Sequence, residues 1–179
     1  MITTNEKNNN GLSADIVIIG GGGAGMASAI SAAHEGVKNI IVLEKVTAPG
    51  GNTAISHGLF AVNSAAQKRL GIKLSIDDVF QDRMAYSNWN VNPRLVRSAL
   101  NRSAEIVDWL EKKGMSFDNI VNFLPEDEGP KVFHKIGAPG ASPEEGAIGE
   151  TLSKILSDEC KKMGVQMVCN APAKKNTDR

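Results

Sequence analysis

The sequence predicts an α/β fold built on a parallel sheet, and three observations predict it. An apolar run covers residues 15–19 and ends at a cluster of glycines. An alanine-rich segment over residues 24–35 follows and ends at Gly36, where glycine commonly terminates a helix. A second apolar run covers residues 39–43. Two strand-sized runs that flank a helix-sized segment are typical of a β-α-β unit with parallel strands.

The length and the charge of the chain limit the number of domains and the kinds of partner that we expect. The 179 residues, 41% of them hydrophobic, suffice for one domain with its own core. Twenty basic residues balance twenty acidic ones, so neither nucleic acid nor an anionic membrane surface is an expected partner. Residues 1–13 are polar and contain no signal peptide, so we expect a disordered tail, a domain over 14–179 and a cytoplasmic protein.

The spacing of the glycines after the first apolar run is typical of a dinucleotide-binding turn. Gly20 permits a tight turn, Gly22 lets the backbone approach a pyrophosphate, and Gly25 lets the helix pack closely on the strand. Glu44 ends the second apolar run, where an acidic side chain accepts hydrogen bonds from ribose hydroxyls and repels a 2′-phosphate. The motif therefore predicts that FAD or NAD is preferred to NADP.

The remaining chain alternates loops and helices. Ser75 and Asp78 resemble a capping box, and the Asn92-Pro93 pair is typical of a helix start. A break is expected near Ser103. The expected elements are a loop over 46–61, helices over 76–86 and 92–114, a loop with one short hairpin over 119–142, a helix over 145–163 and a strand over 165–169.

At residues 16–25, Glu44, Lys45 and 50–53, the sequence resembles the N-terminal part of the fumarate reductase and succinate dehydrogenase flavoprotein superfamily, most closely the soluble fumarate-reductase type. The resemblance covers about residues 14–173. It implies FAD as the cofactor and a Rossmann-like FAD-binding domain with a parallel sheet and a helical insertion. The fold is expected to be incomplete, because the family's capping domain and C-terminal part are absent.

The resemblance implies a role for each matching position. The first glycines and Ala24 would hold the pyrophosphate, Glu44 the adenosine ribose, and Lys45 would add a backbone contact. Residues 50–53 would lie along the flavin side of the cofactor, and Gly58 would approach the isoalloxazine. The expected cofactor-binding residues are Gly20, Gly22, Gly23, Ala24, Gly25, Glu44, Lys45, Gly50, Gly51, Asn52, Thr53 and Gly58.

Family members transfer hydride to or from a carbon–carbon bond of a small substrate, and their substrate-gripping residues lie in the capping domain and the C-terminal half. We therefore expect the chain to be an N-terminal segment of a flavin-dependent oxidoreductase, and we assign no catalytic residue. The alternative is a non-catalytic flavin- or nucleotide-binding module that needs a partner polypeptide. The open edge of the sheet allows a partner chain to bind or the chain to self-associate.

The other chemically active side chains favour structural interpretations. His57 is expected to be a loop histidine with an ordinary hydrogen bond, because its spacing to the next glycine does not match that of relatives with covalently attached FAD. A substrate or flavin contact is open for His134, with a surface loop favoured. We expect no metal site. Side chains with structural expectations are Cys160 and Cys169 as buried thiols, Trp89 and Trp109 in the core, and Glu126, Asp127 and Glu128 in a solvated loop.

Overall fold

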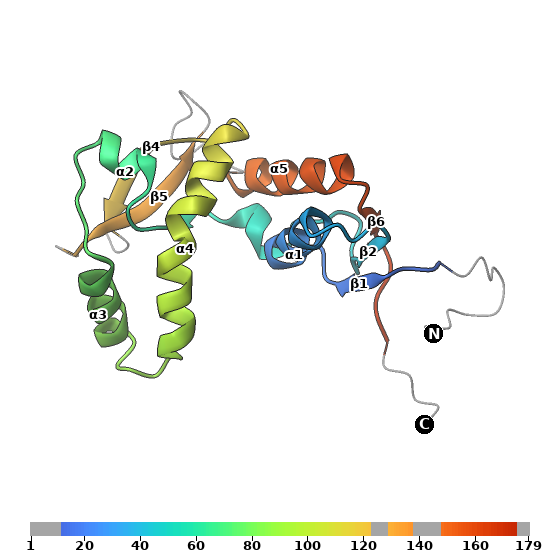
Figure 1. The fold of residues 1–179 in the computed structure, drawn as a ribbon, viewed down its shortest axis with the longest axis horizontal. Coiled ribbons are helices and arrows are strands. Elements are labelled where there is room, and N and C mark those ends of the chain that lie inside the picture. Colours follow the sequence, from blue (N-terminus) through green and yellow to red (C-terminus); the bar gives the residue numbers. More distant parts are fainter. Residues whose placement is uncertain (1–11, 123–128, 138–147, 175–179) are drawn as a thin grey trace. The chain divides into compact units, whose positions relative to one another are not determined.

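The computed structural model describes residues 12–122, 129–137 and 148–174. The chain divides into two compact units (Figure 1). The first, Met1–Ile55 with Glu150–Arg179, is named here the parallel-sheet unit, and the second, Ser56–Gly149, the antiparallel-sheet unit. The acidic run at 126–128 lies outside the described residues.

The parallel-sheet unit contains the β-α-β unit that the sequence predicts. Its three strands pair in the order β1-β2-β6, all parallel. A short 3₁₀ helix, η1, comes after the second strand in the chain and is separated from it by a loop. The elements are β1 (Ile16–Ile19), α1 (Gly23–His34), β2 (Ile40–Leu43), η1 (Gly51–Ile55), α5 (Ile148–Lys162) and β6 (Gln166–Val168). The predicted strands and helices of this unit are confirmed to within a few residues at each end, with residues 145–147 outside the described part.

Two helices meet in the core of this unit. Met26 of α1, Val42 of β2 and Cys160 of α5 are all fully buried. The Cys160 thiol donates a hydrogen bond to the carbonyl oxygen of Met26 at 3.6 Å. Burial, with the nearby charge of Glu159, raises the pKa of the Cys160 thiol to about 11. The prediction of a buried thiol is confirmed for Cys160, whereas Cys169 is only half-buried.

The antiparallel-sheet unit places three helices against a second sheet. Its strands pair in the order β3-β5-β4, all antiparallel. Val62, Val79, Leu100 and Val132 form a buried apolar cluster. The elements are β3 (Gly58–Phe60), α2 (Ala65–Arg69), α3 (Ile76–Tyr86), α4 (Pro93–Lys112), β4 (Ser116–Asn122) and β5 (Lys131–Gly137).

Two helices of this unit test the predicted helix boundaries. The α3 prediction is confirmed, and the Ser75 hydroxyl accepts hydrogen bonds from the N–H groups of Asp77 and Asp78. The predicted break at Ser103 is wrong, because α4 continues through it. The Ser103 hydroxyl donates to the Leu100 carbonyl at 2.8 Å and accepts the Val62 N–H at 3.0 Å, so it does not compete with the helix.

The predicted loops are the main errors. The segment over 46–61 contains η1 and β3, and β4 with β5 occupies much of the segment expected as loop over 119–142, where the hairpin is confirmed. Helix α2 was not predicted. Its capping box pairs Ser64 with Gln67, a Ser-x-x-Gln signal that is visible in the sequence.

Trp89 is not a core residue, which corrects the prediction. It is 59% exposed and has a φ of 60°, because it follows the end of α3 in a tight turn. Trp109 is half-buried on α4, with the Lys113 ammonium 5.4 Å from its ring centroid. The predicted position in or near a helix did not show that Trp89 is exposed and Trp109 half-buried.

Gly25 has a packing role that no other residue can take. A β-carbon at this position would lie 1.9 Å from the Gly20 carbonyl oxygen. Such a distance is far below van der Waals contact, and the neighbouring atom belongs to the backbone. The close approach of α1 to the end of β1 therefore requires glycine at position 25.

We expect Gly25→Ala to destabilise the protein. The backbone clash costs more than the roughly 1 kcal/mol that alanine gains over glycine within a helix, so the net loss should be about 2 kcal/mol. Chemical denaturation measures the free energy of unfolding. Gly22→Ala is the matched control, since a β-carbon at Gly22 would meet its nearest atom, the Gly50 carbonyl oxygen, at 3.7 Å. Equal stability of the two variants would contradict this assignment.

Candidate functional site

The glycine turn leads from β1 into the N-terminus of α1. Gly20 has a φ of 100°, which favours glycine, and its N–H donates to the Leu43 carbonyl at 2.7 Å. Gly22 is the N-cap of α1 and has no side chain that could cap the helix. The first turn of α1 contains no acidic residue. The positive end of the helix dipole therefore has no charged side chain from its own turn to offset it, which suits an anion.

Glu44 places a carboxylate beside this turn. Its Oε2 accepts the Gly21 N–H at 2.7 Å, and its Oε1 accepts the Val46 N–H at 3.0 Å. The side chain is buried, and the hydrogen bonds from Val46 and Gly21 lower the pKa of the Glu44 carboxyl below its ordinary value. An ionised carboxylate accepts about four hydrogen bonds. The two backbone bonds thus leave acceptor capacity for a pair of hydroxyl groups.

A second glycine segment lies directly against the turn. The Gly50 N–H donates to the Gly21 carbonyl at 2.8 Å, and Gly22 and Gly50 form an isolated parallel bridge. The Thr53 hydroxyl accepts the Gly23 N–H at 3.1 Å. Gly50 has a φ of 137°, so its backbone conformation also favours glycine. The glycine turn and the segment from Gly50 to Thr53 therefore lie side by side and contain mainly backbone N–H groups and small side chains.

The structure brings together all the expected cofactor-binding residues except one. Gly20 to Gly25, Glu44, Lys45 and 50–53 lie in the parallel-sheet unit, with Lys45 and Asn52 exposed. Gly58 lies on β3 in the antiparallel-sheet unit. A β-carbon at Gly58 would lie 2.5 Å from the His134 carbonyl oxygen, so strand packing alone already requires glycine there.

Sequence reasoning missed two members of this site. The Val46 N–H donates a hydrogen bond to the Glu44 carboxylate, and such a backbone contact cannot be predicted from the pattern of side chains. Ser153 of α5 is buried, and its hydroxyl lies 3.2 Å from the place of a β-carbon on Gly50. A signal for Ser153 exists, because it is a polar residue next to Leu152 on the buried side of an amphipathic helix.

The packing of the fold requires glycine at position 25 but not at position 22. Its φ of −74° is allowed to any residue, and a β-carbon would meet only the Gly50 carbonyl oxygen, at 3.7 Å. The fold therefore does not need glycine at position 22. A side chain there would instead fill the space in front of the α1 N-terminus.

His134 is buried, which corrects the expectation of a surface loop. It lies on β5 and has no exposed surface. Its Nδ1 lies 3.0 Å from the Val132 carbonyl oxygen and donates to it, so Nε2 accepts a hydrogen bond from the Ser64 hydroxyl at 2.7 Å. Burial lowers the pKa of His134. The Ser64–His134 pair is closed to solvent and has a structural role.

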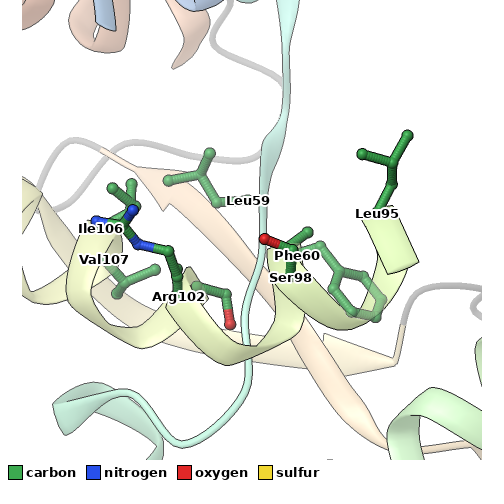
Figure 2. A pocket seen from close by; sticks show the side chains of 9 residues that line it. Leu59, Phe60, Leu95, Ser98, Arg102, Ile106 and Val107 are labelled. Atoms are coloured by element: carbon green, nitrogen blue, oxygen red, sulfur yellow. The ribbon is translucent and has the colours of Figure 1, made fainter. Parts of the chain in front are cut away.

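The antiparallel-sheet unit also contains an apolar groove, shown in Figure 2. It lies between β3 and α4 and has a volume of about 490 Å³. Figure 2 shows Leu59 opposite the stretch of α4 that carries Arg102 and Ile106. Leu95 and Ile106 at the groove are 69% and 51% exposed. The Arg102 guanidinium is paired with Glu105 at 3.6 Å, so the groove is mainly an apolar surface.

The family model described as the FAD binding domain matches residues 15–175. The chain belongs to the FAD-binding domain family. Its cofactor is FAD, and the resemblance to flavoproteins of the fumarate reductase and succinate dehydrogenase type is confirmed. Among the helices that the structure describes, none has both the length and the apolar character to cross a membrane.

Curated relatives of this FAD-binding domain include two reductases. The vinyl phenol reductase of Lactiplantibacillus plantarum is 31% identical over 159 residues, which cover 89% of this chain and 30% of the relative. The acrylate reductase flavoprotein subunit of Shewanella woodyi is 29% identical over 165 residues, which cover 89% of this chain and 31% of the relative. The chain thus spans about a third of the length of these relatives.

Solved structures agree with the family assignment. A flavocytochrome c3 fumarate reductase, in its open conformation, matches with a TM-score of 0.75 and 25% sequence identity. The match covers 89% of this chain and 27% of that chain. The α/β fold with its parallel sheet is therefore that of the FAD-binding part of a larger flavoprotein.

The buried His134 predicts a pH-dependent stability. A histidine in the unfolded chain titrates near pH 6.5, whereas burial keeps the folded pKa lower, so the unfolded state binds more protons in acid. Stability should be complete above about pH 6.5 and fall as the pH drops from there toward the lower folded pKa. Unfolding free energies measured across this range test the prediction.

The control variants for this pH dependence are His134→Gln and His57→Gln. His57 is exposed, and its backbone carbonyl accepts the Ile136 N–H at 3.3 Å, a bond that the substitution keeps. We expect His134→Gln to flatten the pH dependence and His57→Gln to leave it unchanged. The reverse pattern would show that His134 is not the titrating group.

Proposed function

We propose that this chain supplies the FAD site of a flavin-dependent oxidoreductase that transfers hydride to or from a carbon–carbon bond of a small substrate. The observation that carries the proposal is the glycine turn at the α1 N-terminus, whose Gly21 N–H is bonded to the ionised Glu44. The relatives named as vinyl phenol and acrylate reductases support the reaction class, because both named compounds contain a carbon–carbon double bond.

The proposed roles combine the geometry of the turn with the resemblance to fumarate-reductase-type flavoproteins. The backbone of Gly20, Gly22, Gly23, Ala24 and Gly25 binds the pyrophosphate at the α1 N-terminus. The Glu44 carboxylate accepts hydrogen bonds from the adenosine ribose hydroxyls, and its charge disfavours a 2′-phosphate. Lys45 adds a backbone contact. Residues 50–53 line the cofactor beyond the pyrophosphate, and Gly58 approaches the isoalloxazine. Bound FAD supplies the hydride-transferring ring.

The second candidate is a non-catalytic flavin-binding module that works with a partner polypeptide. The observation that favours it is the outer strand β1, which within the described residues pairs only with β2. Val17 and Ile19 on this strand are 42% and 70% exposed. Parallel sheets are ordinarily covered on both faces. A partner chain, or a second copy of this chain, would cover this apolar edge.

An FAD titration of the purified chain tests the proposal. Absorbance and fluorescence report flavin binding, and light scattering reports the mass in solution. We expect one FAD per chain. Absence of FAD binding by a folded chain would contradict the proposed site. One FAD on a monomeric chain would favour the segment of a longer oxidoreductase, whereas FAD bound only by a dimer or a larger oligomer would favour the module that works with a partner chain.

We expect Gly22→Val to abolish most FAD binding without unfolding the protein. The valine side chain fills the space proposed for the pyrophosphate, so FAD affinity should fall about 10- to 100-fold, as for the loss of one or two charge-assisted hydrogen bonds. Ala27→Val, which adds two methyl groups on an exposed part of α1, is the control. A Gly22→Val protein that remains saturated with flavin would rule out the pyrophosphate position.

We expect Glu44→Gln to weaken FAD binding about tenfold, since it removes the charge from the proposed ribose acceptor. Because the variant also alters the bonds from Gly21 and Val46, a comparison of ligands isolates the ribose contact. Wild-type protein should bind ADP more tightly than 2′-deoxy-ADP, and Glu44→Gln should bind both alike. Calorimetry measures the four affinities. A preference for ADP that survives in the variant would place the ribose elsewhere.

A further inference from the structure

The antiparallel sheet has one face that its own helices do not bury. Along β5 the buried residues Val132, His134 and Ile136 alternate with more exposed ones, which follows from the two-residue period of a strand. The more exposed residues are Lys131, Phe133 and Lys135. We name this side of the sheet the lysine face. It therefore carries two ammonium groups with an aromatic ring between them.

The neighbouring strand adds amide groups to the lysine face. Asn119 of β4 pairs with Lys135, Val121 with Phe133, and Asn122 with Lys131. These residues line a cavity of about 690 Å³. Small-molecule sites in proteins have volumes of about 300–1,000 Å³, so the cavity has the size of a site for a small ligand.

The ring of Phe133 is held in place by a glycine on the other neighbouring strand. Gly58 of β3 pairs with Lys135, and a β-carbon on Gly58 would lie 2.6 Å from Cζ and 2.8 Å from Cε1 of Phe133. The edge of the ring thus rests against the backbone where no side chain intervenes. The Phe133 ring therefore lies on the same face of the sheet as Lys135, which is half-buried.

The chemistry of the lysine face selects a planar anion. An aromatic side chain offers its face to another flat, conjugated group. An ammonium at the wall of a cavity gains more from an anionic partner bound there than one in open water does, because water screens the pair less. Among the described residues that line the cavity, two are cationic, and the chain has no net charge, which disfavours a polyanion such as nucleic acid.

We propose that the lysine face binds a small planar aromatic carboxylate, whose ring stacks on Phe133 and whose carboxylate pairs with Lys135. Lys131, at the other end of the cavity, is the second cation, and the side-chain amide of Asn119 is a further hydrogen-bond donor beside Lys135. The proposal rests on the antiparallel-sheet unit alone. It does not require the pyrophosphate and ribose assignments in the parallel-sheet unit, but Gly58, which is assigned to the isoalloxazine, is the neighbour of Lys135 and Phe133 on β3, so competition with FAD has to be measured.

The test uses the full chain and three probes in ligand-observed NMR titrations. Benzoate has both the ring and the charge, benzamide has the ring only, and cyclohexanecarboxylate has the charge only. We expect benzoate to bind most tightly. Lys135→Gln should weaken benzoate about fivefold, the strength of a surface ion pair, and leave benzamide unchanged. Phe133→Leu should weaken benzoate and benzamide alike.

Matched controls keep the result interpretable. Lys68→Gln removes an exposed lysine of α2 in the same unit and should leave every affinity unchanged. Circular dichroism and thermal unfolding check that each variant is folded. The proposal is overturned if wild-type protein does not bind benzoate, if Lys135→Gln binds it normally, or if Lys135→Gln weakens benzamide equally.

Titration of FAD in parallel separates this proposal from the proposed function. We expect FAD to bind Lys135→Gln as it binds wild-type protein, and benzoate not to be displaced by FAD. Displacement of benzoate would assign the lysine face to the flavin and would overturn the proposal. Benzoate binding by a chain that does not bind FAD would contradict the FAD site and leave the lysine face supported.

Discussion

The hydrogen bond between the Gly21 N–H and the Glu44 carboxylate is the interaction on which the parallel-sheet unit depends most. It joins the turn after β1 to the end of β2, two points that are 23 residues apart in sequence. A buried, ionised carboxylate is stable only when hydrogen bonds replace its water. The Gly21 and Val46 N–H groups supply them, so the carboxylate that we propose as the ribose acceptor also fixes the geometry of the turn.

The glycines of this chain serve two separate needs. Gly25 and Gly58 are required by the fold, because a β-carbon would meet backbone oxygen at 1.9 Å and 2.5 Å respectively. No neighbour of Gly22 among the described residues requires glycine there, and its backbone conformation suits other residues. When the fold does not need glycine at a position, the absence of a side chain there can instead serve a bound ligand. The same sequence motif thus combines a position that the fold requires, Gly25, with one that we propose for ligand contact, Gly22.

The sequence was sufficient to predict the β-α-β unit, because apolar runs, an alanine-rich helix and glycine spacing all agreed there. In the second sheet, β3 was missed, and β4 with β5 was expected only as one short hairpin within a loop. The pairing of β3 with β5 joins segments that are far apart in the chain, which a local pattern does not indicate. His134 shows the limit clearly. Its burial requires Ser64, 70 residues away, to satisfy the ring nitrogen. Glu44 was predictable as a site residue, whereas its backbone partner at Val46 was not.

The different surroundings of the two cysteines have a practical consequence. Cys160 is buried with a pKa of about 11, so it holds almost no thiolate at neutral pH and should resist alkylation. Cys169 is half-buried, and the residue two positions later, Ala171, donates its N–H to the Glu44 carbonyl at 2.9 Å. A fluorescent maleimide would therefore label the native chain mainly at one position. That position lies within the segment that pairs with Glu44 and can report ligand-induced changes without any engineered cysteine.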